Sequence, residues 1–153
     1  MEFTYELVEK LKKRKICMKP ATEKQIKDLL SITQNRNLPK AYIEFMCIMG
    51  NGTDGKYMRG ESCFLDEIYL LKQGAIEVLE ENKSKLTLTD NHFVFWMSQG
   101  CTFCMFLLNE GNNPPVYFYN ESGEDRFLKI ADTLTEFWVN YLERKPDLFY
   151  EKK

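Results

Sequence analysis

The sequence of 153 residues has the length of one ordinary domain. Apolar residues make up 44% of it and aromatic residues 14%, which is enough for a hydrophobic core and excludes a largely disordered chain. The formal net charge of -2 gives no sign of a protein built to bind nucleic acid.

The charges are unevenly distributed along the chain. Residues 1–40 hold ten Lys/Arg and five Asp/Glu, whereas residues 41–153 hold eleven and eighteen. The basic residues concentrate between Lys10 and Lys19 on a predicted helix, and such a cluster is typical of a solvated face. We therefore expect no direct binding of nucleic acid. The acidic remainder is better suited to attracting a basic protein partner.

Nothing in the sequence predicts export or membrane insertion. Residues 1–9 mix acids with apolar residues and lack the basic and apolar regions of a secretory signal. No apolar run approaches the roughly 20 residues that span a bilayer. A cytoplasmic protein without membrane contact is expected, in which cysteines stay reduced and mostly pack as small apolar groups. The chain has five of them: Cys17, Cys47, Cys63, Cys101 and Cys104.

Taken in chain order, the N-terminal part predicts helices. Apolar residues at helical spacing predict an amphipathic helix over residues 3–15. Thr22 and Gln25 form a capping-box pattern that starts a second helix, whose apolar residues, Leu30 among them, are expected to be buried. Residues 35–37 are a polar break.

The segment from Leu38 to Gly55 carries the clearest local signal. Pro39 suits the first turn of a helix, because its fixed φ fits there and its missing N–H is not needed. Gly50 is expected to end this helix in the left-handed conformation, and a turn-rich loop that includes Gly52 comes next. Between the proline and the first glycine, apolar residues recur at i, i+3, i+4 and i+7, namely Tyr42, Phe45, Met46 and Met49.

After this loop the hydrophobic period changes. Residues 63–65 and 68–71 are short apolar runs, and residues 74–81 are compatible with a brief helix. Turns about every ten residues then predict an antiparallel meander. Its strands, rich in aromatic and β-branched residues, are expected at 93–97, 101–108 and 116–119, with a short edge strand from 127–128.

The last predicted element is a helix. Thr133 and Glu136 repeat the capping-box pattern, Phe137 belongs to the apolar face, and Pro146 ends the helix. Residues 147–153 are expected to fray. The order of the elements predicts one α+β domain, with a largely antiparallel sheet, or a mixed one, flanked by N-terminal helices and a C-terminal helix.

No assembled active site is predicted. The single histidine, His92, has no second histidine with which to form a metal or catalytic cluster. Cys101 and Cys104 form a CxxC, but residues three apart in a strand point to opposite faces, which favours packing over a redox or zinc site. We expect no enzyme activity, no cofactor and no metal. An enzyme that uses the cysteine pair stays as a competing hypothesis.

The ordered set of motifs resembles the SUKH superfamily of Smi–Knr-like domains. "PATEKQIKDLL" followed by "LPKAYIEFMCIMGNGTDG" is similar to its opening, a capped helix, Leu-Pro, a Tyr-centred helix and a glycine loop. "FVFWMSQGCTFCMFLL", "PVYFYNESGE" and "IADTLTEFWVNYL" are similar to its central strands, the following strand and its closing helix. The structural residues that carry the resemblance are Leu38, Pro39, Tyr42, Phe45, Gly50, Gly52, Gly100 and Phe137.

The resemblance sets the expected domain limits. It places a SUKH-like domain at residues 18–146, after an N-terminal helical extension at 1–17 and before a tail at 147–153. The chain departs from the family pattern in its Cys101/Cys104 pair and in Gln99-Gly100, where the family often has an acidic or glycine-rich stretch. These departures leave the subfamily, and hence the partner, open.

What the resemblance implies is a non-catalytic binding role. Bacterial members are mostly immunity proteins that neutralise toxins, often nucleases or deaminases, and eukaryotic members are regulatory scaffolds. A cognate protein toxin bound by a monomer or weak dimer is therefore expected, with an intracellular scaffold or adaptor as the alternative. Acidic and aromatic residues at loops and turns are the candidates for partner binding: Asp54, Tyr57, Glu61, Asp66, Glu67, Trp96, Gln99, Glu121 and Glu124.

Overall fold

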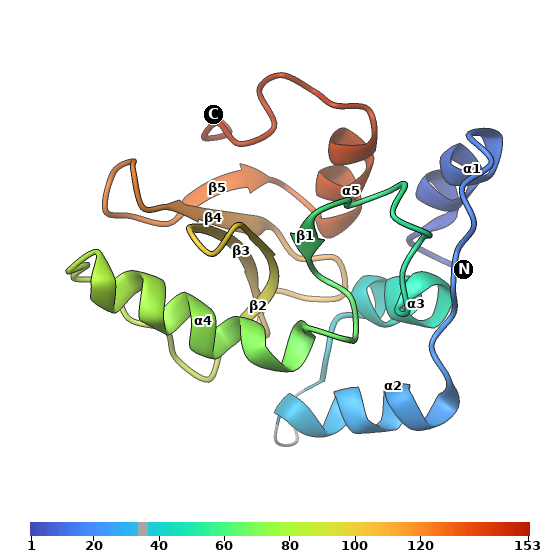
Figure 1. The fold of residues 1–153 in the computed structure, drawn as a ribbon, viewed down its shortest axis with the longest axis horizontal. Helices are drawn as coiled ribbons and strands as arrows, with labels where there is room; N and C mark the ends of the chain where they lie inside the picture. Colours follow the sequence, from blue (N-terminus) through green and yellow to red (C-terminus); the bar gives the residue numbers. More distant parts are fainter. Residues whose placement is uncertain (34–36) are drawn as a thin grey trace.

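The computed structural model of the protein describes residues 1–33 and 37–153 (Figure 1). Of the polar break predicted at 35–37, residues 35 and 36 lie outside this description. Within the described ranges the elements follow in the order α1 (Tyr5–Lys13), α2 (Glu23–Leu30), the 3-10 turn η1 (Ser31–Thr33), α3 (Lys40–Met49), β1 (Glu61–Ser62), α4 (Ile68–Glu81), β2 (His92–Ser98), β3 (Thr102–Leu107), β4 (Val116–Asn120), β5 (Leu128–Ala131) and α5 (Leu134–Leu142).

The strands form one sheet in which neighbours in space are also neighbours in sequence. The order is β1-β2-β3-β4-β5, and each adjacent pair is antiparallel. This confirms the predicted α+β fold and shows an antiparallel rather than a mixed sheet. After β2 the chain reverses at Gln99 and Gly100, both of which have a positive φ (51° and 67°), the conformation that tight hairpin turns require.

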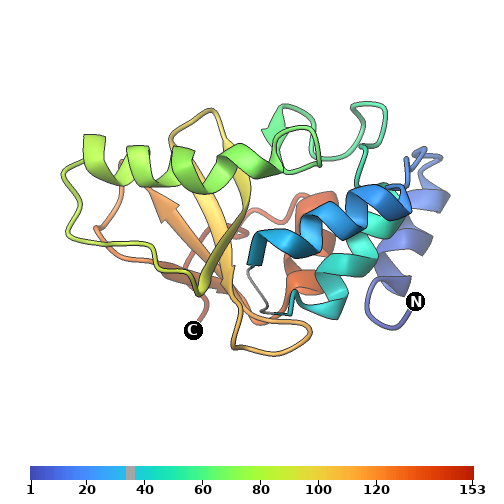
Figure 2. The ribbon, with the colours of Figure 1, turned by 90° about the horizontal axis from the view of Figure 1, so that it is seen from below.

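Helix α4 covers one face of the sheet, and α5 with the C-terminal tail covers the other (Figures 1 and 2). Alternation along the strands explains this, because successive side chains point to opposite faces. Tyr119 in β4 accepts a hydrogen bond from the Asn82 side chain at the end of α4, at 2.6 Å. Its neighbour Phe118 packs instead on Phe149 in the tail, with ring centroids 4.8 Å apart. Both faces of the sheet are therefore buried.

Helix α3 packs at the edge of this core. The Tyr42 ring meets Phe93 and Phe106 of β2 and β3 at 5.2 and 5.3 Å between ring centroids. One turn later, Phe45 stacks on Trp138 of α5 at 4.5 Å. The apolar stripe predicted from residue 42 onward is thus the surface that joins α3 to the sheet and to the closing helix.

Of the two glycines after α3, Gly50 departs from its predicted left-handed conformation, whereas Gly52 lies in a turn-rich loop as predicted. Gly50 is not left-handed, since its φ is -57°. A Cβ there would lie 2.5 Å from the Met46 carbonyl oxygen and 2.9 Å from Leu65 Cδ1, so Gly50 is needed for close approach. The left-handed turn falls at Gly52, whose φ is 106°.

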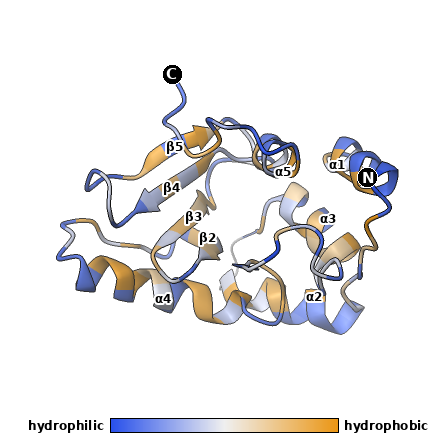
Figure 3. Ribbon diagram, turned by 45° about the horizontal axis from the view of Figure 1, so that its top comes forward, coloured by the Kyte–Doolittle hydropathy of each residue, from blue (hydrophilic) through white to orange (hydrophobic). Residues whose placement is uncertain are grey.

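Helix α4 is longer than the brief helix predicted at residues 74–81. It begins at Ile68, so the apolar run at 68–71 is its first turn. The buried residues of α4 recur at helical spacing, and Figure 3 shows hydrophobic and hydrophilic bands alternating along it. A run of four apolar residues can form a buried strand or a helix end, and its periodicity does not distinguish them.

The tail does not fray as predicted. Leu148 is buried, and Phe149 packs on Trp96 with ring centroids 5.4 Å apart. The backbone N–H of Lys152 donates to the Lys129 carbonyl of β5 at 2.8 Å. Apolar contacts of Leu148 and Phe149, this backbone hydrogen bond, and ion pairs of Glu151 with Arg126 and of Lys152 with Asp132 together hold the segment on the sheet.

Candidate protein-interaction surface

Two of the nine predicted partner-binding residues belong to the core. Tyr57 and Trp96 expose only 3% and 2% of their surface. The Tyr57 hydroxyl donates a hydrogen bond to the Trp138 carbonyl at 2.7 Å. Trp96 packs between Phe137 and Phe149. Burial leaves Trp96 little surface for a partner, whereas Tyr57 is among the residues that line a surface cavity.

Three other predicted residues gather at one end of the sheet. Glu61 pairs with Ser98 in the ladder between β1 and β2, and the Ser98 hydroxyl donates to its carboxylate at 2.8 Å. Gln99 occupies the next turn, and the backbone N–H of Glu121 reaches the Cys101 carbonyl beside it. Burial raises the pKa of Glu61 above its ordinary value, against the lowering effect of its hydrogen bonds.

Two further predicted acids form ion pairs with basic residues of the same chain. Asp54 forms an ion pair with Lys19 at 2.7 Å, and this lysine lowers the pKa of Asp54. Glu124 pairs with Arg126 at 2.6 Å. Both pairs are exposed, so a partner could compete for them, but their charge is largely neutralised locally.

The last two predicted acids, Asp66 and Glu67, stand at the start of α4 beside two exposed apolar side chains. Tyr69 exposes 52% of its surface and Leu70 71%. Their exposure follows from the helix, because the face that packs on the sheet is formed by Ile68, Leu71, Ala75 and Val78, at spacings of three and four. Positions 69 and 70 fall outside that face.

The end of α2 contributes a second pair of exposed apolar residues to the same region. Leu30 exposes 42% of its surface, contrary to its predicted burial, and Ile32 of η1 exposes 37%. Ile32 and Tyr69 line one shallow cavity of about 140 Å³. The end of α2 and the beginning of α4 lie side by side in Figures 1 and 2. We call Leu30, Ile32, Tyr69 and Leu70 the α2–α4 patch.

Charged side chains of both signs lie near the α2–α4 patch. Burial and then the charge of Asp28 raise the pKa of the Tyr69 hydroxyl, against the lowering effect of Lys24. Asp90 lines the shallow cavity, while Asp66 and Glu67 precede the patch on α4. Two lysines also lie here: Lys24 pairs with Asp28 at 3.3 Å, and Lys72 donates to the Thr89 carbonyl at 2.7 Å. Asp28 is thus paired with Lys24, and Asp90 shares the cavity lining with Lys72, so the negative charge that these lysines do not balance comes from Asp66 and Glu67, just before α4.

The residues considered for catalysis have structural contacts. The Nδ1 atom of His92 accepts a hydrogen bond from the Thr89 N–H at 3.0 Å, and burial followed by the charge of Lys72 lowers the pKa of His92. Cys104 is buried in β3, where burial raises the pKa of its thiol well above the ordinary value. Among the described residues, no three His, Cys, Asp or Glu side chains are grouped so as to hold a metal ion.

Comparison with known families decides what kind of domain this is. The model of the SMI1/KNR4 family (SUKH-1) matches residues 20–140. The chain belongs to this family. The match confirms the resemblance drawn from the motifs. No curated protein matches the chain.

The SMI1/KNR4 match runs from just before α2 into α5, so it contains the whole α2–α4 patch. Helix α1 and the tail after α5 lie outside the matched residues. Within the described part of this SMI1/KNR4 chain, no helix is both long and apolar enough to cross a membrane.

The α2–α4 patch was missed from the sequence for a physical reason. Leu30, Tyr69 and Leu70 stand in runs of apolar residues, and such runs are normally assigned to the core. Only the helical phase of α4, with its start at Ile68, shows which members face solvent. A hydrophobic-period analysis that extended α4 back to residue 68 would have separated Tyr69 and Leu70 from the buried stripe.

Proposed function

We propose that this SMI1/KNR4 protein is an immunity protein that neutralises a cognate toxin by direct, non-catalytic binding through the α2–α4 patch. The observation that carries the proposal is the patch itself: four exposed apolar side chains, two of which, Ile32 and Tyr69, line one cavity. Family membership supports a protein-binding role, because bacterial relatives of this kind are mostly immunity proteins. On this proposal the protein acts in the cytoplasm as a monomer or weak dimer.

The chemistry of the patch defines the toxin surface that it would fit. Nucleases and deaminases that act on nucleic acid present basic surfaces to the phosphate backbone. Asp66 and Glu67, the two acids just before α4, would attract such a surface and accelerate association. Tyr69 and Leu70 would supply the buried centre of the interface, where a few anchors account for most of the binding free energy.

The experiment uses the product of the gene next to the one that encodes this chain as the candidate toxin. Wild-type protein is expected to rescue cells that produce this toxin and to bind it in isothermal titration calorimetry. The double substitution Tyr69→Ala with Leu70→Ala should weaken binding by about thirtyfold or more, as expected for loss of interface anchors. Because both side chains are exposed, the melting temperature should change little.

Tyr5→Ala is the control for the tyrosine, since Tyr5 is also an exposed tyrosine, lies on α1 and is outside the patch. It should bind the toxin as the wild type does. Equal affinity for the double variant and the wild type would contradict the role of the patch. Failure of the wild type to bind or rescue, together with a growth or signalling defect on deletion in a toxin-free strain, would instead favour the scaffold alternative.

A further inference from the structure

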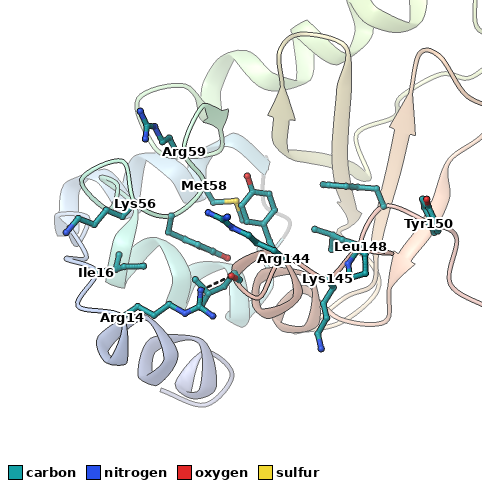
Figure 4. A pocket seen from close by; sticks show the side chains of 14 residues that line it. Arg14, Ile16, Lys56, Met58, Arg59, Arg144, Lys145, Leu148 and Tyr150 are labelled. Atoms are coloured by element: carbon teal, nitrogen blue, oxygen red, sulfur yellow. Dashed lines mark hydrogen bonds between the residues drawn. The ribbon is translucent and has the colours of Figure 1, made fainter.

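A second surface feature lies apart from the α2–α4 patch. A pocket of about 460 Å³ opens between the loop before β1, the end of α5, the end of α1 and the tail (Figure 4). Within the described residues, its charged lining is entirely basic: Arg14, Lys56, Arg59, Arg144 and Lys145. Three of these cations, together with the tail, lie outside the residues matched by the family model.

Most of the five cations of the pocket have no ion-pair partner among the described residues. Lys56, Arg59 and Arg144 form no ion pair with any described residue, whereas Lys145 lies 3.7 Å from Glu143. That glutamate also binds Lys10 at 2.5 Å. Cations commonly follow helix C-termini because they offset the helix dipole, and this accounts for Arg14 and Arg144. It does not account for Lys56 and Arg59, which belong to a loop.

The loop holds its two cations in place through buried neighbours. Tyr57 and Met58, which separate Lys56 from Arg59, are both buried. The Thr53 hydroxyl donates to the Tyr57 carbonyl at 2.9 Å and accepts from the Tyr57 N–H at 3.1 Å. With its backbone fixed in this way, the loop presents both cations without a further cost for ordering its backbone on binding.

The floor and wall of the pocket are apolar and aromatic. Tyr141 and Phe149 line it together with Leu142 and Leu148. Tyrosine, phenylalanine and arginine are the residue types enriched at the centres of protein interfaces. The volume is enough for one or two large side chains of a partner.

The placement of the cations distinguishes an extended ligand from a compact one. Figure 4 shows Lys56 and Arg59 on the loop at one side, Lys145 and Tyr150 at the other, and Arg144 between them. The cations are spread around the pocket and do not converge on one point, as they would for a single phosphate.

We infer that this pocket binds an acidic peptide segment of a partner protein, with an aromatic or aliphatic side chain of the segment inserted on Tyr141 and Phe149. The acidic side chains of the segment would pair with Arg59, Arg144 and their neighbours around the rim. This binding site goes beyond the proposed toxin contact and does not depend on it, because the two surfaces differ in charge and in the elements that form them.

The test is an NMR titration of the full ¹⁵N-labelled chain with a blocked acidic pentapeptide that has tryptophan at its centre. Amide shifts are expected around Arg59, Arg144 and Leu148 and not around Tyr69. Arg59→Glu with Arg144→Glu should weaken binding about tenfold or more, which is the effect expected for loss and reversal of two rim charges. Lys27→Glu with Lys85→Glu is the control, since both lysines are exposed and lie outside the pocket; it should change affinity less than about twofold.

Three other probes separate the alternatives. A basic pentapeptide with the same central tryptophan should cause no shifts in the pocket, and inorganic phosphate should cause none at matched ionic strength. A five-nucleotide single-stranded DNA that bound in the pocket as tightly as the acidic peptide would overturn the inference in favour of nucleic acid. Concentration-dependent shifts of the same amides without any probe would overturn it in favour of a second copy of the chain. If Arg59→Glu with Arg144→Glu is not folded by circular dichroism, Lys56→Glu alone is to be compared with Lys27→Glu.

Discussion

The carboxylate of Glu44 in α3 caps helix α1 at Thr4. Its Oε1 atom accepts hydrogen bonds from the Thr4 N–H at 3.1 Å and from the Thr4 hydroxyl at 2.9 Å. The Phe3 N–H donates to the same oxygen at 3.0 Å. Thr4 is the N-cap residue of α1, yet its own side chain makes no capping bond within the helix. A side chain of the matched family domain therefore anchors the helix that precedes it.

Replacing Glu44 by Gln should destabilise the protein by about 1–2 kcal/mol at neutral pH, because charge-assisted hydrogen bonds become neutral or are lost. Burial alone would raise the pKa of Glu44, but the hydrogen bonds from Phe3 and Thr4 outweigh it and leave the pKa below its ordinary value. A lowered pKa in the folded state means that this stability is present above the unfolded pKa and is lost as pH falls through the folded one. Urea unfolding should show the difference between wild type and variant shrinking below about pH 4.

Glu80→Gln is the control for this effect, since Glu80 is exposed and its side chain has no described partner. It should change the free energy of unfolding by less than about 0.5 kcal/mol at either pH. A Glu44→Gln variant as stable as the control at pH 7 would show that the contact does not hold α1 in solution.

Gly50→Ala should destabilise the protein, although the substitution adds only one methyl group. The added Cβ would meet the Met46 carbonyl and Leu65 at distances that real Cβ atoms do not show. We expect a loss of about 1–3 kcal/mol in urea unfolding, typical of overpacking. Gly123→Ala is the comparison, because the contacts there are ordinary and the variant should be nearly neutral. Similar stabilities for the two variants would contradict the close approach at Gly50.

Tyr57→Phe should lower stability without changing affinity for a protein that binds the α2–α4 patch. The substitution leaves the Trp138 carbonyl without its donor in a buried setting, which costs about 1–2 kcal/mol. Thermal unfolding followed by circular dichroism measures the loss. Calorimetry against the candidate toxin measures affinity, and a clear drop there would restore the original assignment of Tyr57 as a contact residue.

The sequence was most informative where local chemistry decides the structure. The Thr22–Gln25 capping box is present with both hydrogen bonds, and Thr133 caps α5 as predicted. Glu136 departs from the pattern, since its carboxylate accepts from the Asp132 N–H instead of from Thr133. The positions of β2 to β5 were also predicted well, because aromatic and β-branched runs bounded by turns have few alternatives. Strand β1 was not predicted, because its two residues, Glu61 and Ser62, carry no apolar pattern.

The sites were harder to predict than the fold because distant segments build them. The basic pocket joins Arg14, Arg59 and Arg144, which are far apart in sequence and individually typical of solvated residues. Conversely, Trp96 looked like a contact residue near a turn, yet the tail brings Phe149 over it. Docking of a tail depends on tertiary packing that no local pattern encodes.

Burial divides the cysteines into thiols that a reagent can reach and thiols that the core protects. Cys17 and Cys47 are exposed, whereas Cys63 and Cys104 are buried, and burial raises the pKa of both buried thiols well above the ordinary value. In the Cys101→Ser variant, a thiol reagent such as DTNB should therefore modify Cys17 and Cys47 quickly. It should modify Cys63 and Cys104 only at the rate at which the protein unfolds. Burial also raises the pKa of Cys47, so Cys17 should react first at neutral pH.

Serine substitutions and thiol modification together distinguish a packing role of Cys101 and Cys104 from a redox role. If Cys104 only fills space between strands, Cys101→Ser should leave binding and stability unchanged, and Cys104→Ser should cost about 1–2 kcal/mol because it places a hydroxyl in an apolar site. Toxin rescue should persist in the double variant wherever it still folds. Rapid modification of Cys104 in the folded protein, or loss of rescue with Cys101→Ser alone, would show that the pair is a reactive site and not part of the core.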